Sequence, residues 1–392
     1  MDLICYMKRI AFVLKSFAVK AGTERVMSDK MNYLADHGYG VTLVTYEQGT
    51  HPQAFSLHPS IRHIDLDTRF FLVERYGFIK RFLMMQKMRR LFRSRLQTLL
   101  DDIRPDILVT TTYSIKLIDI ILSVKTTACR FVESHVACYT VKKSFDYKDK
   151  PLFRSLAVLY DNIILSKMIK ADCLIALTQG DAADWTRYSS NVIVLPNPVT
   201  YIPETIIRPE NSGHRIICVG RLHEQKGFDL LIDAFAVIAH QCPEWTVDIY
   251  GEGFDKDVLE KQIVRHNLEG RITINSPTDH IYDEYQRSDF FVLSSRYEGF
   301  GLVLVEAMSC GIPCVAFNCK YGPEDIIEDG VDGLLVEDGN VRALAEKMLW
   351  MITHEKERLE MGKRARQSVA RYRKEVVMKE WERAYLSVLD SK

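Results

Sequence analysis

Short β-branched runs alternate with longer segments of helical periodicity, and this alternation is the strongest constraint on the fold. The expected strands lie at 10–14, 41–46, 106–112, 129–135, 173–178 and 192–197, and then at 215–220, 246–251, 272–275, 290–295, 313–317 and 332–336. Helices are expected near 23–37, 227–241, 255–267 and 302–310. Strands that alternate with helices form parallel sheets with helices on both faces. The two series predict an α/β protein with two Rossmann-like, doubly wound domains facing across a cleft.

A segment without periodicity separates the two series. Residues 196–214 contain four prolines and no helical or strand pattern, which is typical of a linker. We therefore expect one domain at 1–198 and a second at 199–372, and 392 residues suffice for both. The segment 373–392 has a helical apolar stripe and is expected to pack back on the first domain.

The net charge is zero, from 52 Lys and Arg against 52 Asp and Glu, which argues against a nucleic-acid binder. The charge is unevenly distributed. Residues 1–198 hold 28 basic and 19 acidic side chains (28 − 19 = +9), so the remainder carries 24 and 33 (24 − 33 = −9). The first half is therefore the one expected to meet an anionic partner.

The nine cysteines show no paired spacing, so we expect reduced, buried thiols rather than disulfides. Cys310, Cys314 and Cys319 are close in sequence, but no histidine lies nearby and a structural role is favoured over a metal site. No apolar run approaches the about 18 residues that span a bilayer. The start of the chain lacks the features of a signal peptide, and a cytoplasmic protein is expected.

The loop VGRLHEQKGFD (219–229) joins an expected strand to an expected helix. Arg221 and Lys226 flank its turn, after Gly220. Two cations beside a helix N-terminus suit a diphosphate, because the helix end adds N–H donors and a favourable dipole. Alone, the same loop is more typical of a solvated connection.

A second loop, SSRYEGFGLVLVEAM (294–308), contains two carboxylates eight positions apart, Glu298 and Glu306. The glycines at 299 and 301 allow close approach of backbone to a ligand, and the amides of Phe300–Val303 would form an anion-binding helix start. Glu306 lies in an apolar helical segment and needs a partner. A ribose diol is one candidate, and a buried Arg or Lys is the alternative.

These motifs, in this order, resemble the family-4 retaining glycosyltransferases of the two-Rossmann-domain (GT-B) type. The resemblance rests on EGFGLVLVE, on the Gly-Arg…Lys-Gly loop, on GPEDIIEDGVDGLLV and on the N-terminal AGTERVMSDKMNYLADHGYGVTLVTY. It covers nearly the whole chain and is strongest at 215–340.

The resemblance implies a role for each matching position. Arg221 and Lys226 would hold the donor diphosphate, Glu306 the ribose, and Glu298 the donor sugar. Backbone contacts would come from Gly220, Phe300, Gly301, Leu302 and Val303. His135, at an expected strand end, would lie beside the transferred sugar, although a lone histidine is more often structural.

The implied reaction is transfer from a nucleotide sugar with retention, without metal or other cofactor. A UDP donor is favoured by family frequency alone. The N-terminal loop has Ala21-Gly22 in place of the family's Gly-Gly pair. Gly22 would still approach the donor or acceptor, and Ala21 is expected to be restricted if it needs a positive φ. The Asp65-Leu66-Asp67 tripeptide resembles a metal motif of another transferase fold, but such tripeptides are common by chance.

Residues 75–95 carry eight basic and no acidic side chains, interleaved with aromatic and aliphatic ones. A basic helix of this kind is attracted to anionic lipid, and 142–150 adds further lysines. The alternative is a helix packed on the domain with solvated charges. The cations expected to face membrane or acceptor are Lys80, Arg81, Lys87, Arg89, Arg90 and Arg93.

The sequence and the resemblance thus predict a hexosyl- or N-acetylhexosaminyltransferase acting on a lipid-linked glycan in cell-surface polysaccharide biosynthesis, at the inner face of the cytoplasmic membrane. Two alternatives stay open: a nucleotide-sugar epimerase of similar fold, and a non-catalytic partner subunit of a glycosyltransferase. Oligomeric state is not predicted.

Overall fold

The computed structural model describes residues 8–147, 149–206 and 213–391. The chain divides into two compact units, the first made of Met1–Pro196 with Val377–Lys392 and the second of Asn197–Val376. Cys5, Lys148 and the stretch 207–212 of the expected linker lie outside the described residues.

The first unit contains a seven-stranded parallel sheet in the order β3-β2-β1-β4-β5-β6-β7. Its strands are β1 (Arg9–Leu14), β2 (Gly40–Thr45), β3 (Arg62–Asp65), β4 (Ile107–Thr111), β5 (Cys129–Ser134), β6 (Cys173–Ala176) and β7 (Val192–Val194). Its helices are α1 (Gly22–Asp36), α2 (Phe78–Ile103), α3 (Ile118–Ile121), α4 (Cys138–Val141), α5 (Pro151–Leu165) and α6 (Gln179–Trp185). Strands β1, β4, β5 and β6 are buried over almost their whole length because helices cover the sheet on both faces.

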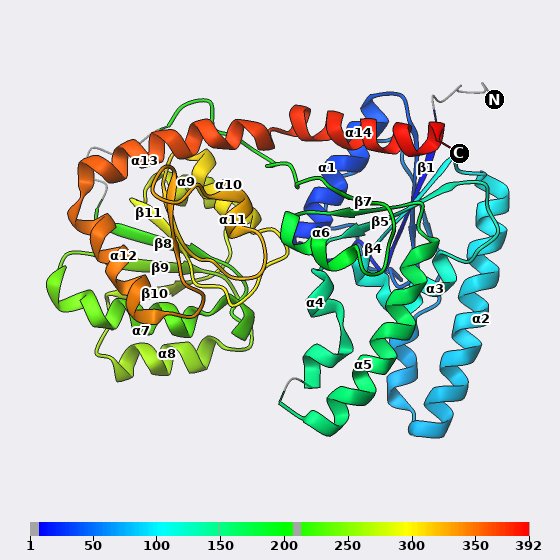
Figure 1. Cartoon of the computed structure of the whole chain (residues 1–392), viewed down its shortest axis with the longest axis horizontal. Coiled ribbons are helices and arrows are strands. Elements are labelled where there is room, and N and C mark those ends of the chain that lie inside the picture. Colours follow the sequence, from blue (N-terminus) through cyan, green and yellow to red (C-terminus); the bar gives the residue numbers. More distant parts are fainter. Residues whose placement is uncertain (1–7, 148, 207–212, 392) are drawn as a thin grey trace. The chain divides into compact units, whose positions relative to one another are not determined.

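The second unit contains a six-stranded parallel sheet in the order β10-β9-β8-β11-β12-β13. Its strands are β8 (Arg215–Val219), β9 (Thr246–Tyr250), β10 (Ile272–Asn275), β11 (Phe290–Leu293), β12 (Cys314–Phe317) and β13 (Gly333–Val336). Its helices are α7 (Phe228–Ile238), α8 (Lys256–Arg265), α9 (Ile281–Gln286), α10 (Leu302–Ser309), α11 (Pro323–Ile326), α12 (Val341–Thr353) and α13 (Glu355–Ser368). Helices α7 and α8 lie on one side of this sheet, and α9 and α10 on the other (Figure 1).

Both sheets are doubly wound, which confirms the fold class expected from the alternation. In each sheet the chain starts near the middle, builds strands toward one edge and then returns to build toward the other. The strand order reverses between β1 and β4 in the first unit and between β8 and β11 in the second. Ligands in such sheets bind beyond the carboxyl ends of the strands at this reversal, so the loops after these strands position the site.

The last helix, α14 (Lys374–Asp390), is drawn in red in Figure 1 and packs against the first unit. Its Trp381 and Tyr385 are buried, and the Trp381 indole N–H donates to the Pro196 carbonyl at 3.0 Å. The Nζ atom of Lys30, on α1, lies 3.1 Å from the centre of the Trp381 ring. The apolar stripe of the C-terminal segment therefore faces this unit's core.

Candidate functional site

The loop after β8 closes tightly against the loop after β11. Gly227 has φ +61°, and a Cβ at this position would lie 2.0 Å from the Ser294 carbonyl oxygen. Glycine is required there, because only glycine adopts that conformation at that approach without a clash. Gly220 has a different function: a Cβ there would lie 3.1 Å from the methylene groups of Lys226. Its small size leaves a path for the lysine stem.

That path brings Lys226 to Glu298. The ammonium donates to Oε1 of Glu298 at 2.6 Å, and the Ser295 hydroxyl donates to the same oxygen at 2.6 Å. Their side chains are 14% and 8% exposed, so the ion pair is largely shielded from water. Two residues that the resemblance assigns to different parts of a donor are thus direct partners.

Arg296 is a residue of this site that the sequence reasoning missed. Its guanidinium donates to both oxygens of Asp229, at 2.8 and 2.6 Å, and to the Glu224 carbonyl at 2.8 Å. A bidentate pair of this kind fixes orientation as well as charge. It links the loop after β11 to the start of α7. An Arg three residues after a strand and an Asp at a helix start were the available signals, but their pairing is not visible in sequence.

Arg221 lies in the same loop as Lys226 but is exposed, and no ion pair of Arg221 is found among the described residues. It is therefore an accessible cation near a shielded one. The sequence reasoning gave both cations the same role, whereas the structure shows that Lys226 is shielded and Arg221 is exposed.

Helix α10 begins at Leu302, directly after Gly301, which has φ +92°. The Phe300 ring is buried and contacts the Tyr372 ring edge-on, with ring centres 5.7 Å apart. A Cβ on Gly322 would lie 2.0 Å from the Phe300 carbonyl oxygen, so the Gly-Pro loop before α11 packs directly on this turn. The first amides of α10, including that of Val303, are held in place at the carboxyl end of β11.

Glu306 is half-buried on α10, and its Oε2 accepts a hydrogen bond from the Tyr285 hydroxyl at 3.4 Å. Tyr285 is fully buried, and burial raises its pKa well above the usual value, so it remains a donor. The carboxylate thus has a neutral, hydroxyl-bearing partner, a neighbour of the same chemical kind as a sugar hydroxyl.

His135 follows β5 and is buried, with 1% of its side chain exposed. Its Nε2–H donates to Oε2 of Glu133 at 2.9 Å, since an ionised carboxylate only accepts. Lys30 donates to the same oxygen at 2.7 Å, and the Tyr385 hydroxyl donates to Oε1 at 2.6 Å. The histidine is held in a buried, hydrogen-bonded cluster through its Nε2 atom, and its place beside a transferred sugar stays a prediction.

The electrostatics of this cluster follow from burial and pairing. Burial by itself raises the pKa of Glu133, but the charge of Lys30 and the hydrogen bonds from His135 and Lys30 lower it to about 2. Burial lowers the pKa of Lys30 to about 8 despite its pairing with Glu133. Burial also lowers the pKa of His135, which keeps the imidazole neutral. The negative charge therefore stays on Glu133.

Comparison with known proteins connects this geometry to a function. Residues 206–368, nearly all of the second unit, match the family described as glycosyl transferases group 1. The crystal structure of TarM shares the fold, with a TM-score of 0.75 at 17% identity, covering 97% of this chain and 99% of that one. The chain has the two-domain (GT-B) fold of these structures, and its second unit matches a glycosyltransferase family.

Two relatives match almost end to end. An uncharacterized glycosyltransferase of Haemophilus influenzae is 26% identical over 96% of this chain and 99% of its own length. The amylovoran biosynthesis glycosyltransferase AmsD of Erwinia amylovora is 27% identical over the same shares. Among solved structures, the lipopolysaccharide outer core galactosyltransferase WaaB in its apo form has a TM-score of 0.75 at 20% identity, with 97% and 99% coverage.

The N-terminal loop needs no positive φ at Ala21. Ala21 has φ −129°, which is extended backbone open to any residue, so the alanine is not restricted there. Gly22 is the first residue of α1, and a Cβ on it would meet no atom within 4 Å. The departure from a Gly-Gly pair therefore costs this loop nothing sterically.

Residues 78–95 of the basic segment form the first two-thirds of α2. Five of its six singled-out cations are exposed: Lys80, Arg81, Lys87, Arg90 and Arg93. Arg89 differs. It is half-buried, donates to both oxygens of Asp119 at 2.8 and 2.6 Å, and is not available as a lipid-facing cation. None of the helices in the described ranges is long and apolar enough to span a bilayer.

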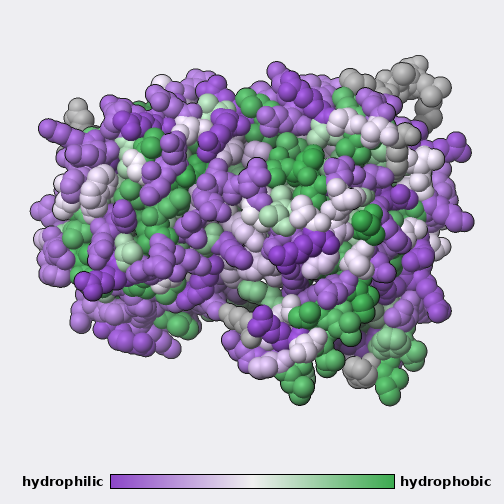
Figure 2. All heavy atoms as spheres, viewed as in Figure 1, coloured by the Kyte–Doolittle hydropathy of each residue, from purple (hydrophilic) through white to green (hydrophobic). Residues whose placement is uncertain are grey.

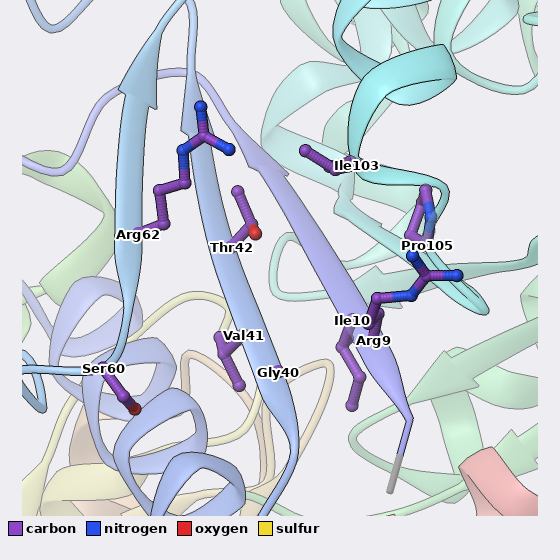
Figure 3. Close-up of a pocket in the computed structure, with 9 residues that line it drawn as sticks. All are labelled: Arg9, Ile10, Gly40, Val41, Thr42, Ser60, Arg62, Ile103 and Pro105. Carbon is purple, nitrogen blue, oxygen red and sulfur yellow. The ribbon is translucent and has the colours of Figure 1, made fainter. Parts of the chain in front are cut away.

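One pocket, of about 210 Å³, lies at the amino ends of β1, β2 and β3 (Figure 3). It is lined by Arg9, Gly40, Thr42 and Arg62 among others. Ligands of doubly wound sheets bind at the opposite, carboxyl ends of the strands. We therefore take the loops after β8 and β11, and not this pocket, as the candidate site.

The cysteines and the acidic tripeptide are also placed. None of the eight described cysteines forms a disulfide, and all eight are buried. Asp65 accepts hydrogen bonds from the Thr45 hydroxyl at 3.0 Å and from the Gly49 amide at 3.0 Å, so its carboxylate has structural partners. In the described part of the chain, no three His, Cys, Asp or Glu side chains are grouped as metal ligands.

Proposed function

We propose that the chain is a retaining hexosyl- or N-acetylhexosaminyltransferase that uses a nucleotide sugar, with UDP as the favoured nucleotide. The observation that carries the proposal is the shielded Lys226–Glu298 pair next to the N-terminus of α10. An ammonium and a helix start together favour a diphosphate. Solved structures of similar fold include HepE in complex with UDP and glucose, at 18% identity and a TM-score of 0.71.

In the proposed complex, Lys226 turns its ammonium to the donor diphosphate, and Arg221 adds a second cation from the exposed side of the loop. Glu306 accepts hydrogens from the ribose hydroxyls, and Glu298, freed from sharing Lys226, binds hydroxyls of the donor sugar. The two cations stabilise the charge that develops on the leaving diphosphate. No metal is part of this scheme.

Retention follows if the acceptor attacks from the face that the diphosphate leaves. The bond between the anomeric carbon and the diphosphate oxygen breaks, and the bond to the acceptor oxygen forms on the same face. The transition state is oxocarbenium-like, and the departing diphosphate takes the acceptor's proton. Balance requires no protein nucleophile.

The proposed acceptor is a glycan, carried on a lipid at the inner face of the cytoplasmic membrane. Support comes from the relatives' names, which include amylovoran biosynthesis and poly(ribitol-phosphate) glycosylation. The exposed cations of α2 fit an anionic membrane surface. The same cations would not be needed by an epimerase, which converts its donor without an acceptor.

A donor screen tests the proposal. UDP-, GDP- and ADP-sugars are compared by thermal shift and by hydrolysis, and the product's anomeric configuration is read by NMR. Lys226→Ala is expected to remove the thermal shift caused by the cognate donor. Lys363→Ala, which changes a 72% exposed lysine of the same unit, is the matched control and should respond like wild type.

Three outcomes would contradict the proposal. A Lys226→Ala variant that responds to donor like wild type would overturn the diphosphate assignment. An isomerised donor without transfer would favour the epimerase, and no response to any nucleotide sugar would favour a non-catalytic subunit.

A further inference from the structure

Helix α5 leaves a wide apolar face uncovered, a feature that the sequence pattern did not reveal. Four of its aliphatic side chains are between 53% and 78% exposed: Leu152, Leu156, Leu159 and Ile163. Their spacing of four, three and four residues puts them on one stripe of the helix. Phe153 and Tyr160 extend the stripe, at 57% and 45% exposed. Figure 2 shows hydrophobic side chains gathered at the lower edge of the view, where α5 lies in Figure 1.

The opposite, narrow face of α5 holds the helix in place by a polar anchor. Asp161 is buried and accepts the backbone N–H groups of Lys143 and Ser144 at 2.6 and 2.8 Å. Ala157 and Leu165 are the neighbouring buried positions, one turn away on each side. The helix is therefore oriented without using its apolar stripe. Contiguous apolar surface of this kind marks a binding site for a protein or a membrane.

The beginning of α2 repeats the pattern. Ile79, Phe82 and Leu83 are exposed by 58% to 74%, and the neighbouring Lys80 and Arg81 are exposed as well. In Figure 1 the start of α2 and the start of α5 extend in the same direction, toward the lower edge of the view. Both segments combine bare aliphatic or aromatic side chains with cations.

The charged residues around this apolar surface indicate which kind of partner covers it. Lys150 and Arg154 are exposed at the start of α5, and Lys142 and Lys143 lie at its base, near the acidic Asp146 and Asp149. Segment 75–95 has eight cations and no acidic residue. A second copy of the chain joined by a two-fold axis would bring like charges together across the contact. Anionic lipid headgroups instead complement the charge, while the acyl boundary accepts the apolar side chains.

We propose that the apolar stripe of α5 and the exposed start of α2 insert into the headgroup–acyl boundary of an anionic bilayer, with the flanking lysines and arginines on lipid phosphates. This proposal adds the place of insertion, and it rests on the membrane association in the proposed function. There the basic face of α2 attracts the enzyme, whereas here α5 supplies the apolar anchor. A helix lying in the interface in this way brings the unit to a lipid-linked acceptor.

Vesicle binding tests the proposal without donor or acceptor. Full-length protein is sedimented with phosphatidylcholine vesicles that contain either no anionic lipid or about one-third phosphatidylglycerol. Replacing Leu156→Ser, Leu159→Ser and Ile163→Ser together should lower the partition coefficient on anionic vesicles by roughly a hundredfold. The control replaces Phe254→Ser, Val258→Ser and Val264→Ser, which are 55% to 96% exposed in the second unit, and should leave binding unchanged.

A second arm places a reporter in the stripe itself. Phe153→Trp should give blue-shifted emission with anionic vesicles, and brominated lipid should quench it. Wild-type binding should weaken in high salt, because the cations contribute part of the attraction. Thermal shift with UDP, measured on every variant, reports the donor site separately, so that a failed donor assignment and a failed membrane site are told apart.

Either of two results would overturn the proposal. The first is an α5 triple variant that binds anionic vesicles as wild type does. The second is sedimentation velocity showing a wild-type dimer that this variant dissociates, together with no quenching by brominated lipid, which would assign the stripe to a second copy of the chain.

Discussion

The Tyr385 hydroxyl donates a 2.6 Å hydrogen bond to Glu133, 252 residues earlier in the chain. The bond connects the last helix, α14, to the carboxyl end of β5, where His135 shares the same carboxylate. Both residues are essentially excluded from solvent. A side chain near the end of the sequence therefore helps to hold the orientation of the buried histidine.

Removing that hydroxyl should destabilise the first unit. Tyr385→Phe leaves Oε1 of a buried, ionised carboxylate without this donor, which costs about 2 kcal/mol. We expect the melting temperature of the first unit to fall by about 5 °C. Tyr113→Phe changes a 53% exposed tyrosine of the same unit and should shift melting by less than about 1 °C. Equal shifts in the two variants would show that the buried hydrogen bond is unimportant.

The buried cluster also predicts a pH dependence of stability. Pairing lowers the pKa of Glu133 from 4.5 to about 2, so its stabilising contribution is present above pH 4.5 and is lost as pH falls toward 2. Glu133→Gln does not titrate. The stability difference between wild type and this variant should therefore be largest near pH 6 and shrink by about 2 kcal/mol toward pH 3.

Urea unfolding of both proteins at several pH values measures this difference. A difference that stays constant from pH 6 to pH 3 would mean that Glu133 does not carry the charge in the folded protein. Above neutral pH the slope for Lys30 has the same sign: its pKa is lowered from 10.5 to about 8, so its buried charge is a cost that deprotonation relieves, and stability rises with pH between these values.

Two glycines with left-handed backbone, Gly227 and Gly339, allow a steric test of the loop after β8. Gly227→Ala would put a Cβ 2.0 Å from the Ser294 carbonyl oxygen, so the loops after β8 and β11 must separate. Gly339→Ala has a similar φ, +72°, but open space around it, and should cost only about 1 kcal/mol. We expect Gly227→Ala to cost at least about 3 kcal/mol and to weaken UDP binding. Similar stabilities of the two variants would contradict the close approach.

The Lys226–Glu298 pair predicts competition between the carboxylate and a diphosphate. Glu298→Gln keeps an acceptor for the ammonium but removes its negative charge, so UDP should bind about three- to tenfold more tightly while sugar transfer falls. Glu360→Gln, at an exposed position in the same unit, should change neither. Calorimetry with UDP measures the affinity, and weaker binding by Glu298→Gln would contradict the competition.

Much of the second unit was predictable from local pattern. The strand RIICVG and the helix after Gly227 were visible because one has a β-branched run and the other a helical stripe. Their loops carry chemistry wherever the fold is doubly wound, and both Arg221 and Lys226 fall there. The partnership of Lys226 with Glu298 was not predictable, because it joins positions 72 residues apart.

The first unit shows where pattern reasoning fails. Lys30 lies on an amphipathic helix and would be assigned to a solvated face, yet it is fully buried against Glu133 and Trp381. Arg89 was predicted to be one of the lipid-facing cations, but it forms an ion pair with Asp119 instead. Whether a charge is solvated or paired depends on elements that are distant in sequence.

The sequence by itself determined the class of fold and the order of its strands along the chain, except β3 (Arg62–Asp65), which was not expected. It also led to the loops after β8 and β11, where we propose that the donor binds. These follow from periodicity and glycine placement, which are local properties. Only the tertiary structure decided that His135 is buried in a charged cluster, that Arg296 ties two loops together and that α5 keeps an apolar stripe uncovered. Periodicity shows which face of an element is apolar, but the packing of other elements decides whether anything covers that face.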